Sequence, residues 1–212
     1  FIKLIKDQYI IQKRSLLLEK QKAETELKIL KAQLNPHFLF NTLNNIYSLS
    51  VVNSPITSQS IAVLSEILDC ILYRCSSTYV PLTQEITLLE NYISLEKLRY
   101  DDRLSVVFNH EMDQNGMIAP LILLSLVENA FKHGVGFIEN PTIDIELKDS
   151  TSELFFRVAN KKGTAMNETK DESSGIGLTN VKRRLELLYP TNHQLEGNET
   201  GSDFILTLSM QH

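Results

Sequence analysis

The sequence predicts an α+β fold, in which helices come first and a helix-covered sheet follows. Apolar residues recur at helical spacing over residues 36–100, and short segments after residue 104 alternate between apolar and polar residues. A glycine-containing turn then leads into one further helix. Helices segregated from an antiparallel or mixed sheet are typical of a two-layer sandwich. The 212 residues suffice for one compact domain or two small ones.

Residues 1–33 carry a patchy heptad pattern that predicts a dimeric coiled coil. Its apolar seam has one residue in every seven: Ile2, Tyr9, Leu16, Ala23 and Leu30. Pro36 removes a backbone donor and disfavours helix at Asn35. We therefore expect the helix to kink or restart just before His37.

Charge is unevenly distributed along the chain. Residues 1–34 hold eight Lys/Arg against four Asp/Glu, whereas the rest is acidic and the whole chain carries a net charge of -5. An acidic body argues against direct nucleic-acid binding, which needs positive charge against phosphate. The basic start is compatible with a cytoplasmic stretch after a membrane span, and a solvated helix face explains it nearly as well. Because the chain begins at Phe1 rather than Met, we expect a piece of a longer protein, anchored in the membrane upstream of residue 1.

Two consecutive helices are predicted between Phe38 and Cys75, with a turn near Asn53–Pro55. Such a pair forms an antiparallel hairpin, and two hairpins from two chains give a four-helix bundle, so a homodimer is expected. Cys70 and Cys75 are too few for a disulfide scaffold and are expected to be small, half-buried residues in a reducing compartment. The buried side of the second helix is expected to carry Ile61, Leu64, Ile67, Leu68 and Ile71.

A helix over 83–100 follows, with Thr83 as a possible N-cap and Glu85 in its first turn, where a negative charge favours the helix dipole. Residues 161–174 are polar and lack an apolar period, so they are expected to form a mobile loop. The remaining expected elements are a strand at Leu104–His110, a helix at Pro120–His133, strands at Ile143–Leu147 and Leu154–Val158, a helix over 178–188 and a strand at Phe204–Leu208.

The helix that contains residues 126–134 has a polar face suited to a metal–phosphate group. Glu128, Asn129, Lys132 and His133 fall on one face by their spacing. Carboxylate and amide oxygens are ligands that Mg²⁺ accepts, and an ammonium group neutralises phosphate charge. An ordinary solvated helix face accounts for the same pattern about equally well.

Two further segments carry candidate chemistry. The segment 173–178 contains Gly175 and Gly177 before a helix, and such a turn lets free backbone N–H groups approach phosphate oxygens, although it also serves plain loop-to-helix connections. His37 lies beside the expected kink among apolar residues. A histidine in that setting is usually a core or capping residue, but neutral imidazole is also a competent nucleophile towards phosphorus.

Four segments in this order resemble the cytoplasmic kinase core of the LytS-type sensor histidine kinases. They are Leu-Asn-Pro-His-Phe-Leu-Phe-Asn at 34–41, Leu-Glu-Asn-Tyr-Ile at 89–93, Val-Glu-Asn-Ala-Phe-Lys-His-Gly at 127–134 and Gly-Ile-Gly-Leu-Thr-Asn-Val-Lys-Arg-Arg-Leu at 175–185. The resemblance covers residues 30–210. It implies a histidine-bearing dimerisation region followed by an ATP-binding α/β sandwich of the GHKL fold. The implied boundaries are a helical linker at 1–33, dimerisation and phosphotransfer helices at 34–100 and the ATP-binding domain at 101–212.

The resemblance implies a sensor histidine kinase of a two-component system, which uses ATP to phosphorylate itself and then a response regulator. His37 would be the phosphoacceptor, Asn41 one turn on would orient its imidazole, and Glu128 would activate or orient a reactant. Asn129 would be the Mg²⁺ ligand, and Lys132 would contact phosphate. The implied ATP-binding set is Asn129, Lys132, His133, Asn160, Gly163, Gly175, Gly177 and Leu178. The implied setting is the cytoplasmic portion of a bacterial inner-membrane protein, paired with a regulator that has a LytTR-type DNA-binding domain.

One departure from the family pattern bears on adenine recognition. The usual Asp-x-Gly box is replaced here by Asn160-Lys161-Lys162-Gly163. The carbonyl of Asn160 still offers an acceptor to the adenine amino group, although the negative charge is lost. Two alternatives therefore stand beside the kinase: a catalytically weak or inactive scaffold that signals through dimer contacts, and a GHKL ATPase that does not phosphorylate itself. The histidine motif at 34–41 argues against the second.

Overall fold

The structure, a computed structural model, describes Lys13 and residues 36–100, 103–113, 116–135, 138–162 and 176–211. The chain divides into two compact units, 1–43 and 44–212. Among the described residues, helix α2 spans Pro36–Val51, and the expected kink or restart before His37 falls at the edge of the described range. The expected coiled coil at 1–33 lies outside the described residues except for Lys13. Within the described ranges, no helix combines the length and hydropathy that crossing a membrane requires.

A tight turn joins α2 to α3 (Thr57–Leu72). Asn53 adopts the left-handed conformation with φ of 51°, and the N–H of Ser54 donates to the carbonyl of Leu49 at 2.9 Å. Leu64, Ile67 and Ile71 are buried, as expected, but the prediction that Ile61 shares their side is wrong, because its side chain is exposed. Each residue turns the helix by about 100°, so Ile61 lies about 60° from Leu64 on the side away from Ile67.

Helix α4 (Leu82–Tyr100) begins one residue earlier than expected and is tied to the sheet domain from its first residue. Strand β1 (Val80–Pro81) pairs with β3 (Met117–Ile118), and the N–H of Leu82 donates to the carbonyl of Gly116 at 2.8 Å. Thr83 therefore lies inside the helix rather than at its N-cap. This link between residues 80–82 and 116–118 was not predicted, because two-residue strands leave no periodic signal in a sequence.

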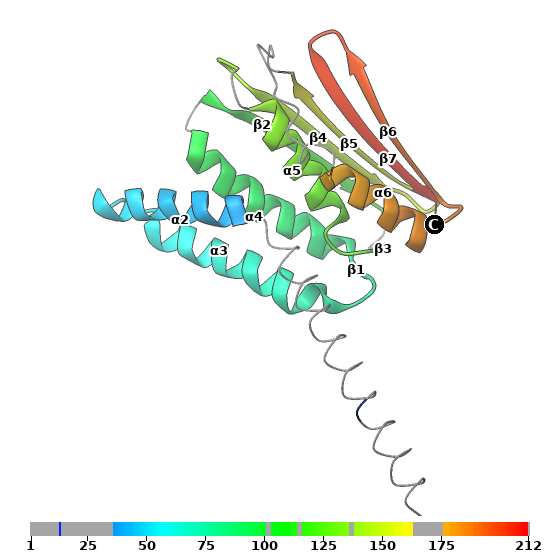
Figure 1. The fold of residues 1–212 in the computed structure, drawn as a ribbon, viewed down its shortest axis with the longest axis horizontal. Helices are drawn as coiled ribbons and strands as arrows, with labels where there is room; N and C mark the ends of the chain where they lie inside the picture. Colours follow the sequence, from blue (N-terminus) through cyan, green and yellow to red (C-terminus); the bar gives the residue numbers. More distant parts are fainter. Residues whose placement is uncertain are drawn as a thin grey trace, which may run out of the picture. The chain divides into compact units, whose positions relative to one another are not determined.

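The main sheet has five strands in the order β2-β4-β5-β7-β6. The pair β2–β4 is parallel, and the other three pairs are antiparallel. Helices α5 (Ile122–Gly134) and α6 (Ile176–Leu188) pack on one face of the sheet, α4 packs on α5, and α3 packs on α4 (Figure 1). The strands are β2 (Ser105–Met112), β4 (Thr142–Asp149), β5 (Glu153–Lys161), β6 (His193–Thr200) and β7 (Asp203–Gln211).

The core lies between this sheet and α5. Alternate residues of the central strands are buried, and the register sets them side by side: Ile145 opposes Val158, which opposes Leu206. The side chains between them along each strand are more exposed, so one face of the sheet is covered and the other faces solvent. The predicted α+β sandwich is confirmed, whereas strand β6 was not predicted.

Candidate nucleotide and phosphoacceptor site

Helix α5 presents the four polar residues that its sequence places on one face. Glu128, Asn129 and His133 are half-buried and Lys132 is exposed, while Val127, Ala130 and Phe131 are buried against the sheet domain. The predicted division of this helix into a polar and an apolar face is confirmed. Lys132 and His133 lie in the last turn, where the negative end of the helix dipole favours positive charge.

A buried carboxylate fixes the start of α5. Leu121 precedes the helix with a left-handed φ of 64°, and its N–H donates to Oε1 of Glu85 at 2.7 Å. Glu85 is 1% exposed, and burial raises its pKa to about 7, although hydrogen bonds from the amides of Leu121 and Leu123 partly oppose that rise. The sequence assigned Glu85 to the dipole of its own helix. Glu85 does lie in the first turn of α4, and it also accepts a hydrogen bond from the N-terminal end of a different helix.

The segment 89–93 supports α5 from the other side. Leu89, Tyr92 and Ile93 are buried, and the ring of Tyr92 packs edge-on against Phe131 with centroids 5.5 Å apart and planes at 87°. Burial raises the pKa of the Tyr92 hydroxyl, and the nearby carboxylates of Glu96 and Glu128 add to the effect. This segment of α4 therefore packs directly behind the turn that carries Glu128 and Lys132.

The end of α5 and the end of β5 meet at a position that only glycine allows. A Cβ added to Gly134 would lie 2.6 Å from Cβ of Asn160 and 2.8 Å from its Nδ2, and both distances are shorter than the closest approach of non-bonded atoms. Asn160 is buried, and its Nδ2 donates to the carbonyl of Lys161 at 3.0 Å. Two motifs that lie apart in the sequence, 127–134 and 160–163, are thus brought together where Gly134 contacts Asn160.

His37 and Asn41 form a second cluster, one helical turn apart near the start of α2. His37 is exposed, and Nδ2 of Asn41 lies 3.2 Å from both ring nitrogens of His37. This amide is within hydrogen-bond distance of the imidazole, as the spacing predicts. The two residues belong to the unit 1–43, whereas the residues of α5 and β5 belong to the unit 44–212.

The remaining predicted residues come from the segment around α6. Gly163 and Gly175 lie outside the described residues. Gly177 is the second residue of α6, and Leu178 follows it with a half-buried side chain. Helix α6 packs on α5, so the described part of the glycine-rich motif adjoins the helix that carries Asn129.

Sequence reasoning missed two residues that build this site, Glu85 and Gly134. A glycine at the end of a helix ordinarily signals a C-cap, so its contact with Asn160 has no signature of its own. Glu85 left a weak sequence signal, because its spacing places it on the same side of the helix as the apolar residues Leu82, Ile86 and Leu89, which are buried.

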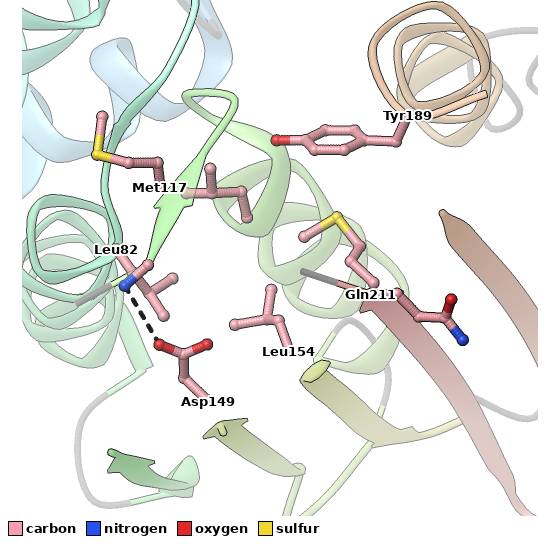
Figure 2. A pocket seen from close by; sticks show the side chains of 9 residues that line it. Leu82, Met117, Asp149, Leu154, Tyr189 and Gln211 are labelled. Carbon is pink, nitrogen blue, oxygen red and sulfur yellow. Dashed lines mark hydrogen bonds between the residues drawn. The ribbon is translucent and has the colours of Figure 1, made fainter. Parts of the chain in front are cut away.

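A small pocket lies at the opposite end of β5 from Asn160 and is a separate feature (Figure 2). The N–H of Gly116 donates to Oδ2 of the buried Asp149 at 3.3 Å on its wall. The side chains labelled around it are Leu82, Met117, Asp149, Leu154, Tyr189 and Gln211. None of the predicted site residues lines it.

A family model and curated relatives place this chain in one family. A family model described as histidine kinase matches residues 25–104. The sensor protein LytS of Enterococcus faecalis is 30% identical over 196 residues, and the sensor histidine kinase BtsS of Escherichia coli K12 is 34% identical over 173 residues. These matches cover 86% and 79% of this chain but 33% and 30% of the relatives, so the chain spans about a third of their length. A solved complex of the histidine kinase ThkA with the response regulator protein TrrA has a TM-score of 0.43 at 17% identity, covering 91% of this chain and 65% of that one.

Proposed function

This chain belongs to the LytS-type sensor histidine kinases, and from that membership we propose that it is the ATP-dependent kinase core of a two-component system. It transfers the γ-phosphoryl group of ATP to His37 and then to an aspartate of a response regulator. One observation carries the proposal: the contact of Gly134 with Asn160, which joins two nucleotide-site motifs of the family in one place.

Nucleotide binding follows from the family, and the residues present fit ATP with Mg²⁺. Asn129 supplies the amide oxygen of a Mg²⁺ ligand, and Lys132 and His133 at the end of α5 face the phosphates. Nδ2 of Asn160 already donates to the chain at Lys161, so its carbonyl oxygen is the atom that accepts the adenine amino group. The backbone around Gly163, Gly175 and Gly177, with Leu178, completes the proposed site. The metal ion neutralises phosphate charge when bound.

The proposed reaction needs little from the protein beyond positioning and electrostatics. A ring nitrogen of His37 attacks the γ-phosphorus, a P–N bond forms, and the P–O bond to ADP breaks. Asn41 holds the imidazole through its amide, 3.2 Å from the ring. Glu128 orients or activates a reactant from the polar face of α5.

A homodimer is proposed through the exposed face of α2. Phe40, Leu43, Tyr47 and Val51 follow helical spacing, and Phe40 and Tyr47 are 68% and 69% exposed. The opposite side of the helix is also apolar and is buried at Phe38 and Ile46. A helix that is apolar on both sides buries the second side against another element, and a second copy supplies one in a four-helix bundle.

The wider setting is proposed from the family alone. The proposed functional division assigns 1–33 to a helical linker, 34–100 to dimerisation and phosphotransfer and 101–212 to ATP binding. The partner is a response regulator with a LytTR-type domain, and the full protein is anchored in the bacterial inner membrane upstream of residue 1.

Incubation with γ-labelled ATP and Mg²⁺ tests the proposal. Wild type should acquire acid-labile label, whereas His37→Ala should acquire none and Asn129→Ala should lose both labelling and nucleotide-induced thermal stabilisation. His110→Ala and Asn109→Ala are matched controls, because both residues are exposed on β2. Label that persists in His37→Ala would disprove the phosphoacceptor, and wild type with neither label nor nucleotide binding would favour a scaffold.

A further inference from the structure

Cys70 and Cys75 lie closer together than their sequence spacing suggests. Cys70 is in the last turn of α3, and Cys75 is in the short 3₁₀ helix Arg74–Ser76 that follows. Their sulfur atoms are 3.3 Å apart, and each residue is 6% exposed. A disulfide bond has a length of about 2.05 Å, so the two sulfurs need to approach by little more than about 1 Å to form one.

A third residue reaches the pair from α4. Nε2 of Gln84 lies 3.5 Å from Sγ of Cys70 and 4.0 Å from Sγ of Cys75. An amide N–H donated to sulfur stabilises a thiolate more than a thiol, because the thiolate is the stronger acceptor. The pair therefore has an amide donor beside it, and both cysteines are buried rather than half-buried as the sequence predicted.

The two sulfurs are chemically unequal. The hydrogen bond between the two sulfurs lowers the pKa of Cys70 to about 6, helped by Gln84 and Arg74 and opposed by burial and Asp69. The same hydrogen bond raises the pKa of Cys75, and burial and the charge of Glu85 raise it further, against a smaller effect of Arg184. Because the side-chain amide of Gln84 also lies nearer to Cys70 than to Cys75, Cys70 is assigned as the nucleophile of the pair.

We propose that Cys70 and Cys75 are a redox-active thiol pair that small hydroperoxides oxidise to an intramolecular disulfide. The Cys70 thiolate attacks one oxygen of the peroxide, the O–O bond breaks, and Cys70 sulfenic acid and hydroxide (or alkoxide) form. Cys75 then attacks the sulfenic sulfur, the S–S bond forms, and the hydroxyl group and the Cys75 proton leave as water. With hydrogen peroxide, two thiols lose two electrons, the peroxide gains them, and two molecules of water are released.

Burial selects the class of oxidant. At 6% exposure of each cysteine, a glutathione or protein disulfide has to displace the surrounding chain, so the proposal assigns a small peroxide as the oxidant. The bond would tie the last turn of α3 to the connection that leads into α4. It would close residues 70–75 into a loop and leave residues 76–79 as the remaining connection to β1.

The test uses the whole chain and does not depend on kinase activity. Reduced protein is treated with hydrogen peroxide, quenched with an alkylating reagent and measured by intact mass and peptide mapping. The chain has two cysteines, so an intramolecular bond can only join these two. We expect a species that has lost two hydrogen atoms, resists alkylation at both sites and regains both thiols with dithiothreitol.

Single variants test the order of the chemistry. Cys75→Ser should accumulate sulfenic acid at Cys70, trapped by dimedone, whereas Cys70→Ser should give little trapping at Cys75. Gln84→Leu should shift the pH profile of Cys70 alkylation to higher pH. Circular dichroism checks that each variant folds, and the wild-type measurement stands without them. Folded wild type that forms no internal disulfide, forms only bonds between chains, or shows equal trapping at both cysteines would overturn the proposal.

Discussion

The substitution Glu85→Gln should change the free energy of unfolding more favourably at pH 8 than at pH 5. The carboxyl group is 1% exposed, and burial raises its pKa from the ordinary 4.5 to about 7. Below pH 4.5 the carboxyl group is protonated in both the folded and the unfolded chain, so folding does not change its protonation. Above pH 7 it is ionised in both, and the folded state carries the cost of a buried charge. The stability associated with the protonated group is therefore lost as pH rises from 4.5 through 7.

The size of this loss follows from the two pKa values. Their difference of 2.5, at 1.36 kcal/mol for each pKa unit, corresponds to about 3 kcal/mol. Glutamine keeps an oxygen for the N–H of Leu121 but cannot ionise. Its amide hydrogens need partners in the buried site, which costs about 1 kcal/mol at every pH. Because this cost is the same at every pH, it does not contribute to the difference between the values at pH 5 and pH 8.

Urea unfolding at pH 5 and pH 8 measures the effect. The unfolding free energy of Glu85→Gln minus that of wild type should rise by about 2.5 kcal/mol between the two pH values, because the unfolded carboxyl group is already largely ionised at pH 5 and part of the loss lies below that pH. Glu186→Gln, on an exposed position of α6, should leave the corresponding difference nearly constant. A change below about 0.5 kcal/mol for Glu85→Gln would show that this carboxyl group does not titrate as its burial implies.

Three further substitutions test the packing of the site, the dimer face and the core. Gly134→Ala should lower the free energy of unfolding by about 1–3 kcal/mol and weaken ATP binding, because the new Cβ displaces Asn160. Alanine by itself favours a helix, so a gain in stability would contradict the contact between Gly134 and Asn160. Tyr47→Asp should convert a dimer to a monomer in light scattering without loss of helix in circular dichroism, and a persistent dimer would exclude this face. Leu123→Ala should cost about 2–5 kcal/mol in urea unfolding, whereas the exposed Leu187→Ala should cost under about 0.5 kcal/mol; similar losses would contradict the burial pattern.

Local patterns allowed the sequence to predict much of this fold. The spacing of apolar residues in 122–134 predicts both the helix and the face on which Glu128 and Lys132 lie, because a helix that covers a sheet needs an apolar stripe. The alternation in 143–147 and 154–158 predicts strands with one buried face for the same reason. The expected strands ended too early at their C-terminal ends, where residues such as Asn160 and Lys161 remain paired but are polar, and the first expected strand began one residue too early, at Leu104.

The features that the sequence did not predict depend on distant partners. Strand β6 reads His-Gln-Leu-Glu-Gly-Asn-Glu-Thr and lies at an edge, where most of its side chains face water and leave no apolar alternation. The role of Glu85 depends on an amide 36 residues away, and that of Gly134 on a strand end in a different layer. Such contacts exist only once the chain is folded, so no local window of sequence records them.

Helix α4 limits where this chain can be cut into fragments or recombined with its relatives. It carries motif 89–93, packs on α3 and on α5, and holds the start of α5 through Glu85. A fragment that begins at residue 101 would lose the carboxylate that caps α5 and expose the ring of Phe131, which Tyr92 covers. An ATP-binding module exchanged between kinases of this type would therefore travel with its preceding helix, and recombination breakpoints would be tolerated before residue 80 rather than after residue 100.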